Sequence, residues 1–277
     1  MKASWLFFRH APFWSVAFLT YVFLLAPFLV LAAGSVDGGE ASIFFSFPPK
    51  SFSLKWYFEI PAKYFQALWT SFTLAAATAV LSTLIGTTAA LGIMRGWGRN
   101  KEALQTYFRL PLQVPFVVTG VVFLQFYYQI APWIGFNPVG TFGGILAAHV
   151  FMCTPYSVGT VSAMLANMSP SYEEAAESCG ATRWSIFRRV TFPLIRTGIF
   201  AGMLYGFIIS FGDVPIAVFL SGTSYTTLPV EIFHTLLFDY SRTILPISVL
   251  VVVFCLFLII GLQKIAGLDM AMPSAGR

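Results

Sequence analysis

Long runs of apolar residues alternate along the chain with short polar segments that carry most of its charges. A helix that crosses a bilayer needs about 20 mostly apolar residues, whereas a strand of a membrane barrel needs about 10. The uncharged stretch 110–172 is long enough for two such helices, and proline, glycine and asparagine at 131–140 divide it. Single runs cover 13–33, 64–94, 197–220 and 243–263. The pattern therefore predicts six membrane-spanning helices.

Composition points to the same class of protein. Of the 277 residues, 57% are hydrophobic and 10% are charged, whereas a soluble domain carries about 25% charged residues. These values exclude a soluble enzyme, a disordered chain and a secreted disulfide scaffold. The three cysteines form no CxxC pair, which argues against a zinc site and a disulfide framework. The expected fold class is an all-α integral membrane protein.

The basic residues predict how the helices are oriented. If both termini lie in the cytoplasm, twelve Lys and Arg fall on that side and four fall on the other, namely Lys50, Lys55, Lys63 and Arg242. Such an excess marks the cytoplasmic side of an inner-membrane protein. The run 13–33 is longer than the apolar core of a cleaved leader, so we expect it to be retained. The expected organisation is an N-terminal helix with a periplasmic loop over 1–63 and a five-helix core over 64–277.

A stripe of small residues marks one face of the fifth run. Gly198, Gly202, Gly206 and Ser210 recur at every fourth position, so their side chains share one face of a helix. Small residues let helices approach closely in lipid. The stripe predicts close helix packing, either inside the chain or against a second membrane subunit.

The familiar motifs of catalysis and nucleotide binding are missing from the sequence. It contains no GxxxxGK[ST], no HExxH and no GxSxG, so the chain is not expected to bind ATP or to catalyse a reaction. His149 lies beside small residues and is interpreted as a core histidine with a hydrogen-bond partner. We expect no catalytic residue, metal site or cofactor in the chain, and no nucleic-acid partner.

Residues 169–194, between the fourth and fifth runs, carry acidic residues first and basic residues later. Gly180 can adopt the left-handed conformation that ends a helix. Thr182 can cap a second helix running to Arg189, and Pro193 is expected to close the unit. The segment is predicted to form a helix–turn–helix on the cytoplasmic surface, and an amphipathic connector without a partner is the alternative.

This segment resembles the EAA loop of permease subunits in type I, binding-protein-dependent ABC importers of bacteria. The matching elements are Glu174-Ala175-Ala176, three residues, Gly180, nine residues, and Val190-Thr-Phe-Pro193. Val190 and Phe192 replace the isoleucine and leucine that are usual in the family. The resemblance extends over about 64–266, the five-helix core of that fold, with the first run as an added helix.

The resemblance implies that the loop seats in a groove of a separate ATPase subunit. The coupling residues would be Glu173, Glu174, Ala175, Ala176, Gly180 and Arg183. The implied partners are a pair of ATP-binding subunits that hold ATP and magnesium, a second and different permease, and a periplasmic solute-binding protein. The alternative function is a self-sufficient secondary transporter or channel.

A finer resemblance, carried by 47–57 and 210–230, is to the polyamine-type branch, which also imports other small polar solutes. Asp213 is the clear charge within a predicted span, and an ionisable group there is a functional hypothesis. Together with Tyr225, Glu231 and Asp239, it is expected to line a path for a cationic solute. The alternative is that Asp213 bonds to a neighbouring helix or caps a break near Pro215.

Overall fold

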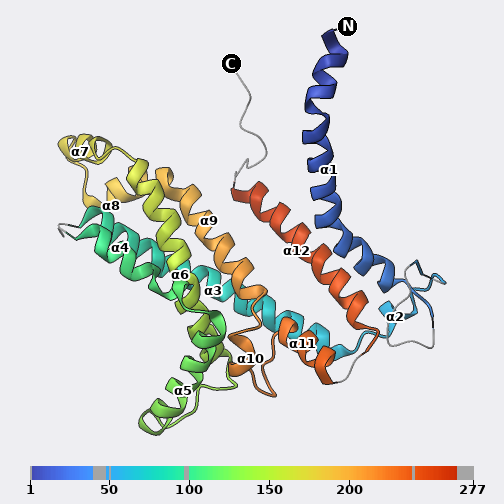
Figure 1. The fold of residues 1–277 in the computed structure, drawn as a ribbon. Helices are drawn as coiled ribbons and strands as arrows, with labels where there is room; N and C mark the ends of the chain where they lie inside the picture. Colours follow the sequence, from blue (N-terminus) through green and yellow to red (C-terminus); the bar gives the residue numbers. More distant parts are fainter. Residues whose placement is uncertain (1, 40–47, 50, 97–99, 239–240, 267–277) are drawn as a thin grey trace. The chain divides into compact units, whose positions relative to one another are not determined.

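The computed structural model describes residues 2–39, 48–49, 51–96, 100–238 and 241–266. Within these residues the regular elements are helices. In addition, Asp37 and Phe52 form one isolated antiparallel β-bridge. In chain order (Figure 1) they are α1 (Lys2–Ser35), α2 (Lys55–Phe58), α3 (Ala62–Arg95), α4 (Lys101–Arg109), the 3₁₀ helix η1 (Leu110–Gln113), α5 (Phe116–Ile134), α6 (Phe142–Asn167), α7 (Ser171–Ser178), α8 (Arg183–Ile186), the π-helix η2 (Phe187–Thr191), α9 (Phe192–Phe211), α10 (Ala217–Leu220), α11 (Leu228–Phe238) and α12 (Ile244–Ala266).

Each of the six predicted runs contains a long helix. Five helices have the length and hydropathy needed to cross a membrane: α1, α3, α5, α6 and the continuous helix Arg183–Phe211. The apolar helix α12 covers the sixth run. The predicted division between the third and fourth runs is confirmed, because Gly135, with φ of 75°, ends α5 and the chain re-enters a helix at Phe142. The fold is therefore the all-α membrane architecture that the sequence predicts.

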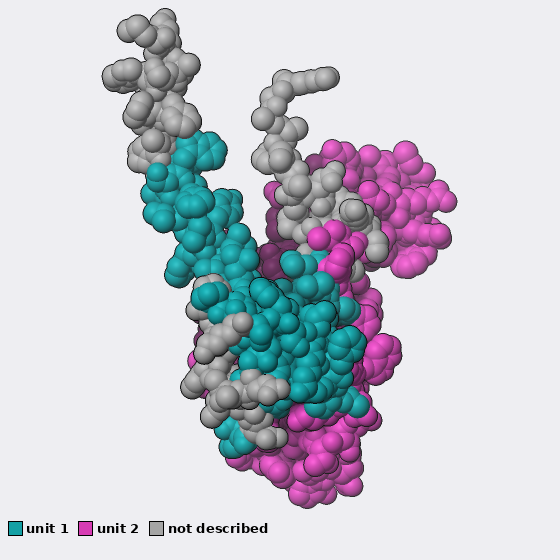
Figure 2. Space-filling model, turned by 90° about the vertical axis from the view of Figure 1, so that its right-hand side faces the viewer, with its two compact units in different colours: residues 1–62, 235–256 teal, residues 63–234, 257–277 magenta. Residues whose placement is uncertain are grey.

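The chain divides into two compact units (Figure 2), residues 1–62 with 235–256 and residues 63–234 with 257–277. In the first unit, the side chain of Trp56 joins segments that are distant in sequence. Its indole Nε1 donates to the carbonyl of Asp37 at 3.1 Å, and the guanidinium carbon of Arg242 lies 5.5 Å from its ring centroid. The Trp56 ring thus contacts both the loop after α1 and the turn that precedes α12.

The second unit is organised around close packing of α6 with α3 and α9. A Cβ on Gly198 would meet Met164 and the carbonyl of Thr160, and a Cβ on Gly202 would meet the backbone of Ser157. Gly206 faces Ala79 and Ser82 of α3 in the same way. The glycine stripe therefore lies at helix contacts inside the chain, where a missing side chain lets the backbones approach.

The fifth run ends earlier than predicted, because α9 stops at Phe211 rather than continuing to Leu220. Pro215 lacks the N–H that would bond to the carbonyl of Phe211 in a continuing helix, and its ring would clash there. The chain is non-helical until the short helix α10 begins at Ala217. Asp213 therefore lies in a break between two helices and not within one.

Candidate functional site

The helix–turn–helix predicted for residues 169–194 is present at one end of α6 and α9 (Figure 1). The helix α7 ends at a turn in which Gly180 has φ of 80°, a conformation that glycine adopts without steric cost. The hydroxyl of Thr182 accepts a hydrogen bond from the N–H of Ser185 at 3.3 Å and caps α8. Both local predictions, the glycine turn and the threonine cap, are confirmed.

The prediction that the second helix stops near Arg189 and that Pro193 closes the unit is wrong. The chain stays helical from Arg183 to Phe211. The segment η2 is π-helical, and the N–H of Phe192 bonds to the carbonyl of Phe187, five residues earlier. This wider turn, together with the position of Pro193 in the first turn of α9, accommodates a residue that has no N–H. The second helix of the loop, α8, is thus continuous with a membrane-spanning helix, whereas α7 is joined to it through the turn at Gly180.

Most of the expected coupling residues form an outward surface, which we call the loop face. Glu174, Ala175, Gly180 and Arg183 are exposed, and Ala176 is half-buried. The face has its acidic residue on α7 and its basic residue at the start of α8. A surface of this kind, small residues flanked by opposite charges, suits a helix that docks into a groove of another protein.

Two aromatic residues beside the motif were missed in the sequence. Tyr172 is 57% exposed and Trp184 is 69% exposed. The Trp184 ring stacks on Phe187, with 5.6 Å between the centroids. Aromatic residues are enriched where proteins dock. In the sequence, the position of Tyr172 and Trp184 on either side of Gly180 could have indicated them.

Glu173 is placed differently from the rest of the expected coupling set. Its carboxylate atom Oε2 lies 2.8 Å from Nε of Arg95, at the end of α3. Its other oxygen, Oε1, accepts a hydrogen bond of 2.6 Å from the hydroxyl of Thr191, at the end of η2. Glu173 therefore faces into the chain and joins α7 to two other helical segments.

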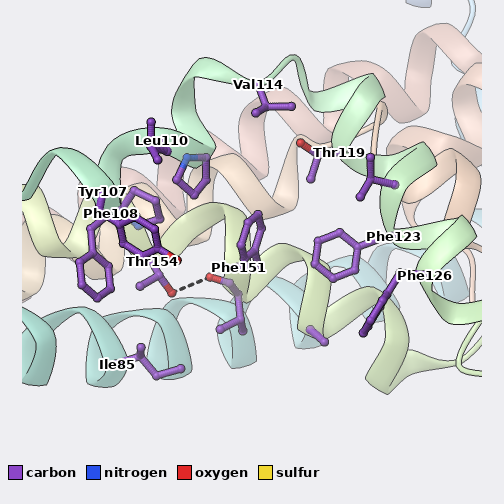
Figure 3. A pocket seen from close by; sticks show the side chains of 15 residues that line it. Ile85, Tyr107, Phe108, Leu110, Val114, Thr119, Phe123, Phe126, Phe151 and Thr154 are labelled. Atoms are coloured by element: carbon purple, nitrogen blue, oxygen red, sulfur yellow. Dashed lines mark hydrogen bonds between the residues drawn. The ribbon is translucent and has the colours of Figure 1, made fainter. Parts of the chain in front are cut away.

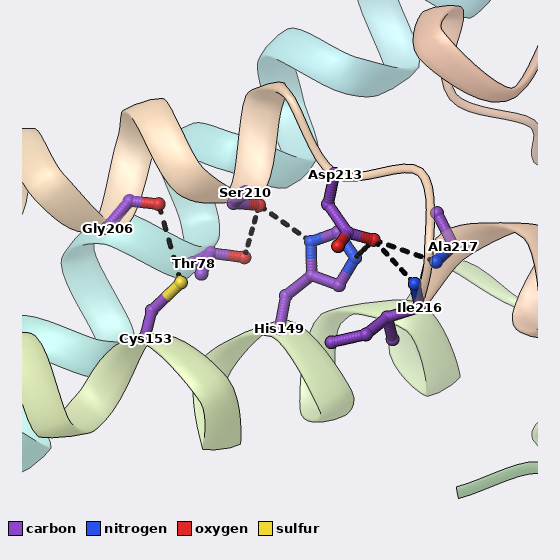
Figure 4. Close-up of polar contacts among 8 residues, drawn as sticks. All are labelled: Thr78, His149, Cys153, Gly206, Ser210, Asp213, Ile216 and Ala217. Atoms are coloured by element: carbon purple, nitrogen blue, oxygen red, sulfur yellow. Dashed lines mark hydrogen bonds and ion pairs between the residues drawn. The ribbon is translucent and has the colours of Figure 1, made fainter. Parts of the chain in front are cut away.

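Asp213 caps the helix that follows the break (Figure 4). Its Oδ2 accepts hydrogen bonds from the backbone N–H of Ile216 at 3.1 Å and of Ala217 at 2.8 Å. The same oxygen lies 3.5 Å from Nε2 of His149 on α6, and the side chain of Asp213 is only 3% exposed. Its contacts are those of a helix cap that also faces a histidine on a neighbouring helix.

His149 extends this polar cluster into the helix bundle (Figure 4). Its Nδ1 lies 2.8 Å from the hydroxyl oxygen of Ser210, and that hydroxyl donates to Oγ1 of Thr78 on α3 at 3.3 Å. All three side chains are buried. The interpretation of His149 as a core histidine with a hydrogen-bond partner is confirmed.

Of the other residues expected on the solute path, Tyr225 lies in the segment before α11 and Glu231 lies on α11. Tyr225 is 42% exposed, and its ring contacts Phe142, with 6.1 Å between the centroids. Glu231 forms an ion pair of 2.7 Å with Lys63. Asp239 lies outside the described residues. Among the described residues, no group of three or more His, Cys, Asp and Glu side chains could hold a metal ion.

A groove of about 900 Å³ runs along the second unit (Figure 3). Its walls come from α3, α4, η1, α5 and α6 and are almost entirely apolar. Of its polar residues, Thr154 donates its hydroxyl to the carbonyl of Val150 at 2.7 Å. A lining of this kind does not stabilise a charged solute, which needs paired or hydrogen-bonded surroundings.

Comparisons with known proteins agree with this architecture. Residues 82–267 match the family described as binding-protein-dependent transport system inner membrane component. The chain is 32% identical over 223 residues to the putrescine transport system permease protein PotI of Escherichia coli strain K12, covering 79% of this chain and 78% of PotI. It is 28% identical over 250 residues to the spermidine/putrescine transport system permease protein PotC of Haemophilus influenzae, covering 90% of this chain and 93% of PotC. The fold is shared with a chain in the crystal structure of a bacterial ABC transporter involved in the import of alginate, with a TM-score of 0.78, 14% identity, and coverage of 98% of this chain and 100% of that one.

Proposed function

The chain belongs to the family of binding-protein-dependent transport system inner membrane components, and from this membership we propose that it forms half of a translocation path for a small, polyamine-like cation. It is a multi-pass permease subunit of an ABC importer in the bacterial inner membrane. ATP is hydrolysed in a separate subunit, because permeases of this family have no ATPase site of their own.

The observation that carries the coupling role is the loop face. Its exposed charges and small residues stand on α7, on the turn at Gly180 and on α8, which continues directly into α9. We propose that this face lies in the cytoplasm, with both chain termini on the same side, and docks on one of two ATP-binding subunits that hold ATP and magnesium. A periplasmic binding protein delivers the solute, and a second, different permease completes the path.

The proposed solute rests on the similarity to PotI and PotC, whose names refer to putrescine and spermidine. Carboxylates attract the ammonium groups of such cations, and an exposed tyrosine ring offers a cation–π surface. Asp213, Tyr225, Glu231 and Asp239 are therefore the proposed path residues. Because Asp213 and Glu231 have partners inside the chain, their contact with solute belongs to another conformation of the alternating-access cycle.

Reconstitution tests the function against its alternative. Proteoliposomes would carry the chain alone, or together with its second permease, ATPase subunits and binding protein, and uptake of radiolabelled putrescine would be measured. We expect uptake only from the complete set and only with ATP. Uptake by the chain alone, driven by an ion gradient, would instead identify a secondary transporter or channel.

A further inference from the structure

The acidic residues of α7 do not share one environment. Glu174 and Glu177 are exposed on the surface of the helix. The side chain of Glu173 is 22% exposed and that of its partner Arg95 is 26% exposed, while Thr191 is 3% exposed. Partial burial strengthens an ion pair, because the pair is less screened than one at the surface.

Glu173 uses its two carboxylate oxygens on two different elements. One oxygen pairs with Arg95, the last residue of α3, at 2.8 Å. The other accepts the 2.6 Å hydrogen bond from Thr191, the last residue of η2. We call these three residues the loop bridge. They join α7 laterally to the two helices that pack together at Gly206.

Besides the loop bridge, α7 contacts the neighbouring segments α8 and η2 and is held by its chain connections. It has eight residues, and an isolated helix shorter than about 12 residues is marginal in water. It is preceded by the Ser169–Pro170 turn and followed by the left-handed turn at Gly180. The turn at Gly180 separates α7 from the helix that continues into α9, whereas the loop bridge ties α7 directly to α3 and η2.

We propose that Glu173 is a positioning residue that passes movement of the loop face to α3 and α9, rather than a contact of the ATPase subunit. This rests on the proposed function, since it assumes that an ATPase subunit moves α7. Both carboxylate oxygens have partners inside the chain, so Glu173 needs none on another subunit. This reassigns one residue of the expected coupling set.

The test compares variants in the complete reconstituted transporter, with two readouts: ATP hydrolysis, and putrescine taken up per ATP hydrolysed. Glu173→Gln and Arg95→Gln each weaken the same ion pair, and Thr191→Val removes the other bond while keeping the shape of the side chain. Glu177→Gln is the matched control, because it neutralises an exposed carboxylate on the same helix. The exchange Arg95→Glu with Glu173→Arg restores an ion pair of reversed polarity.

We expect Glu173→Gln and Arg95→Gln to lower uptake per ATP by about fivefold or more, the usual scale of coupling between sites. ATPase subunits should remain bound and hydrolysis should continue. Thr191→Val should lower the ratio less, the exchanged pair should recover most of it, and Glu177→Gln should match the wild type.

Two results would overturn the proposal. In the first, Thr191→Val takes up as much putrescine per ATP as the wild type, and Glu173→Gln either does the same or fails to assemble. The other is loss of ATPase binding in Glu173→Gln but not in Arg95→Gln, which would restore Glu173 as a direct contact. Failure of the proposed function is distinguishable, because the wild-type complex would then show no ATP-dependent uptake at all.

Discussion

A tight contact between α6 and α9 in the second unit gives the sharpest stability prediction, for Gly202→Ala. A Cβ at this position would lie 2.9 Å from both Cα and Oγ of Ser157 and 3.0 Å from Oγ1 of Thr160. Non-bonded carbon atoms are comfortable at about 3.5–4.0 Å, so α6 and α9 must separate by roughly 0.5–1 Å. The backbone of Ser157 cannot rotate away as a flexible side chain would.

The expected magnitude follows from two opposing effects. Overpacking costs about 1–3 kcal/mol, and replacing a helical glycine by alanine returns at most about 1 kcal/mol through helix propensity. We therefore expect Gly202→Ala to lower the free energy of unfolding by about 1–2 kcal/mol. Unfolding of the purified permease in mixed micelles, followed by circular dichroism as the fraction of denaturing detergent rises, measures this quantity.

Gly159→Ala is the matched control, because it lies on α6 and its added Cβ would meet nothing within 4 Å. This variant should be as stable as the wild type or more stable. Equal unfolding midpoints for Gly202→Ala and Gly159→Ala would refute the reasoning, since the two differ in contact and not in chemistry.

The remaining predictions concern transport. Glu174→Lys should abolish co-purification of the ATPase subunits and ATP-dependent uptake while leaving membrane insertion intact, and unchanged uptake would count against the loop face. Trp184→Ala should weaken ATPase binding about tenfold or more, as loss of an aromatic side chain buried in an interface does. The control is Trp133→Ala, which removes a side chain that is 89% exposed on α5 and should leave ATPase binding unchanged. Asp213→Asn should reduce putrescine uptake with assembly preserved, because the amide can still accept the N–H of Ala217 but carries no charge for the cation. Uptake at the wild-type rate would remove Asp213 from the path.

The six helices were predictable because lipid imposes a simple requirement. A spanning segment must be long, apolar and internally hydrogen-bonded, and this leaves a direct record in the sequence. The turn at Gly180 and the cap at Thr182 were also predictable, since each depends on one residue and its immediate neighbours.

Features that depend on proline geometry or on distant contacts were not predictable in the same way. The break before α10 lies in an apolar run, so hydropathy alone extends the fifth helix to Leu220. A break near Pro215 was expected only as the alternative role of Asp213. Pro193, in contrast, does not end its helix, because the preceding π-helical turn accommodates a residue without an N–H. The pairing of Glu173 with Arg95 joins segments separated by α4, η1, α5 and α6. No local pattern distinguishes Glu173 from its neighbour Glu174.

The sequence of the first helix, α1, is less constrained by packing than the sequence of a core helix such as α6. In Phe13–Ser35, none of the most apolar stretch of 18 residues is buried within the chain, whereas 61% of the most apolar stretch of α6 is buried. Leucine, phenylalanine and valine are interchangeable toward hydrocarbon, but they differ in shape at a tight helix contact. Random apolar mutagenesis should therefore leave α1 functional in most clones and inactivate most clones altered in α6, and natural drift should erode the sequence of α1 faster than that of α6.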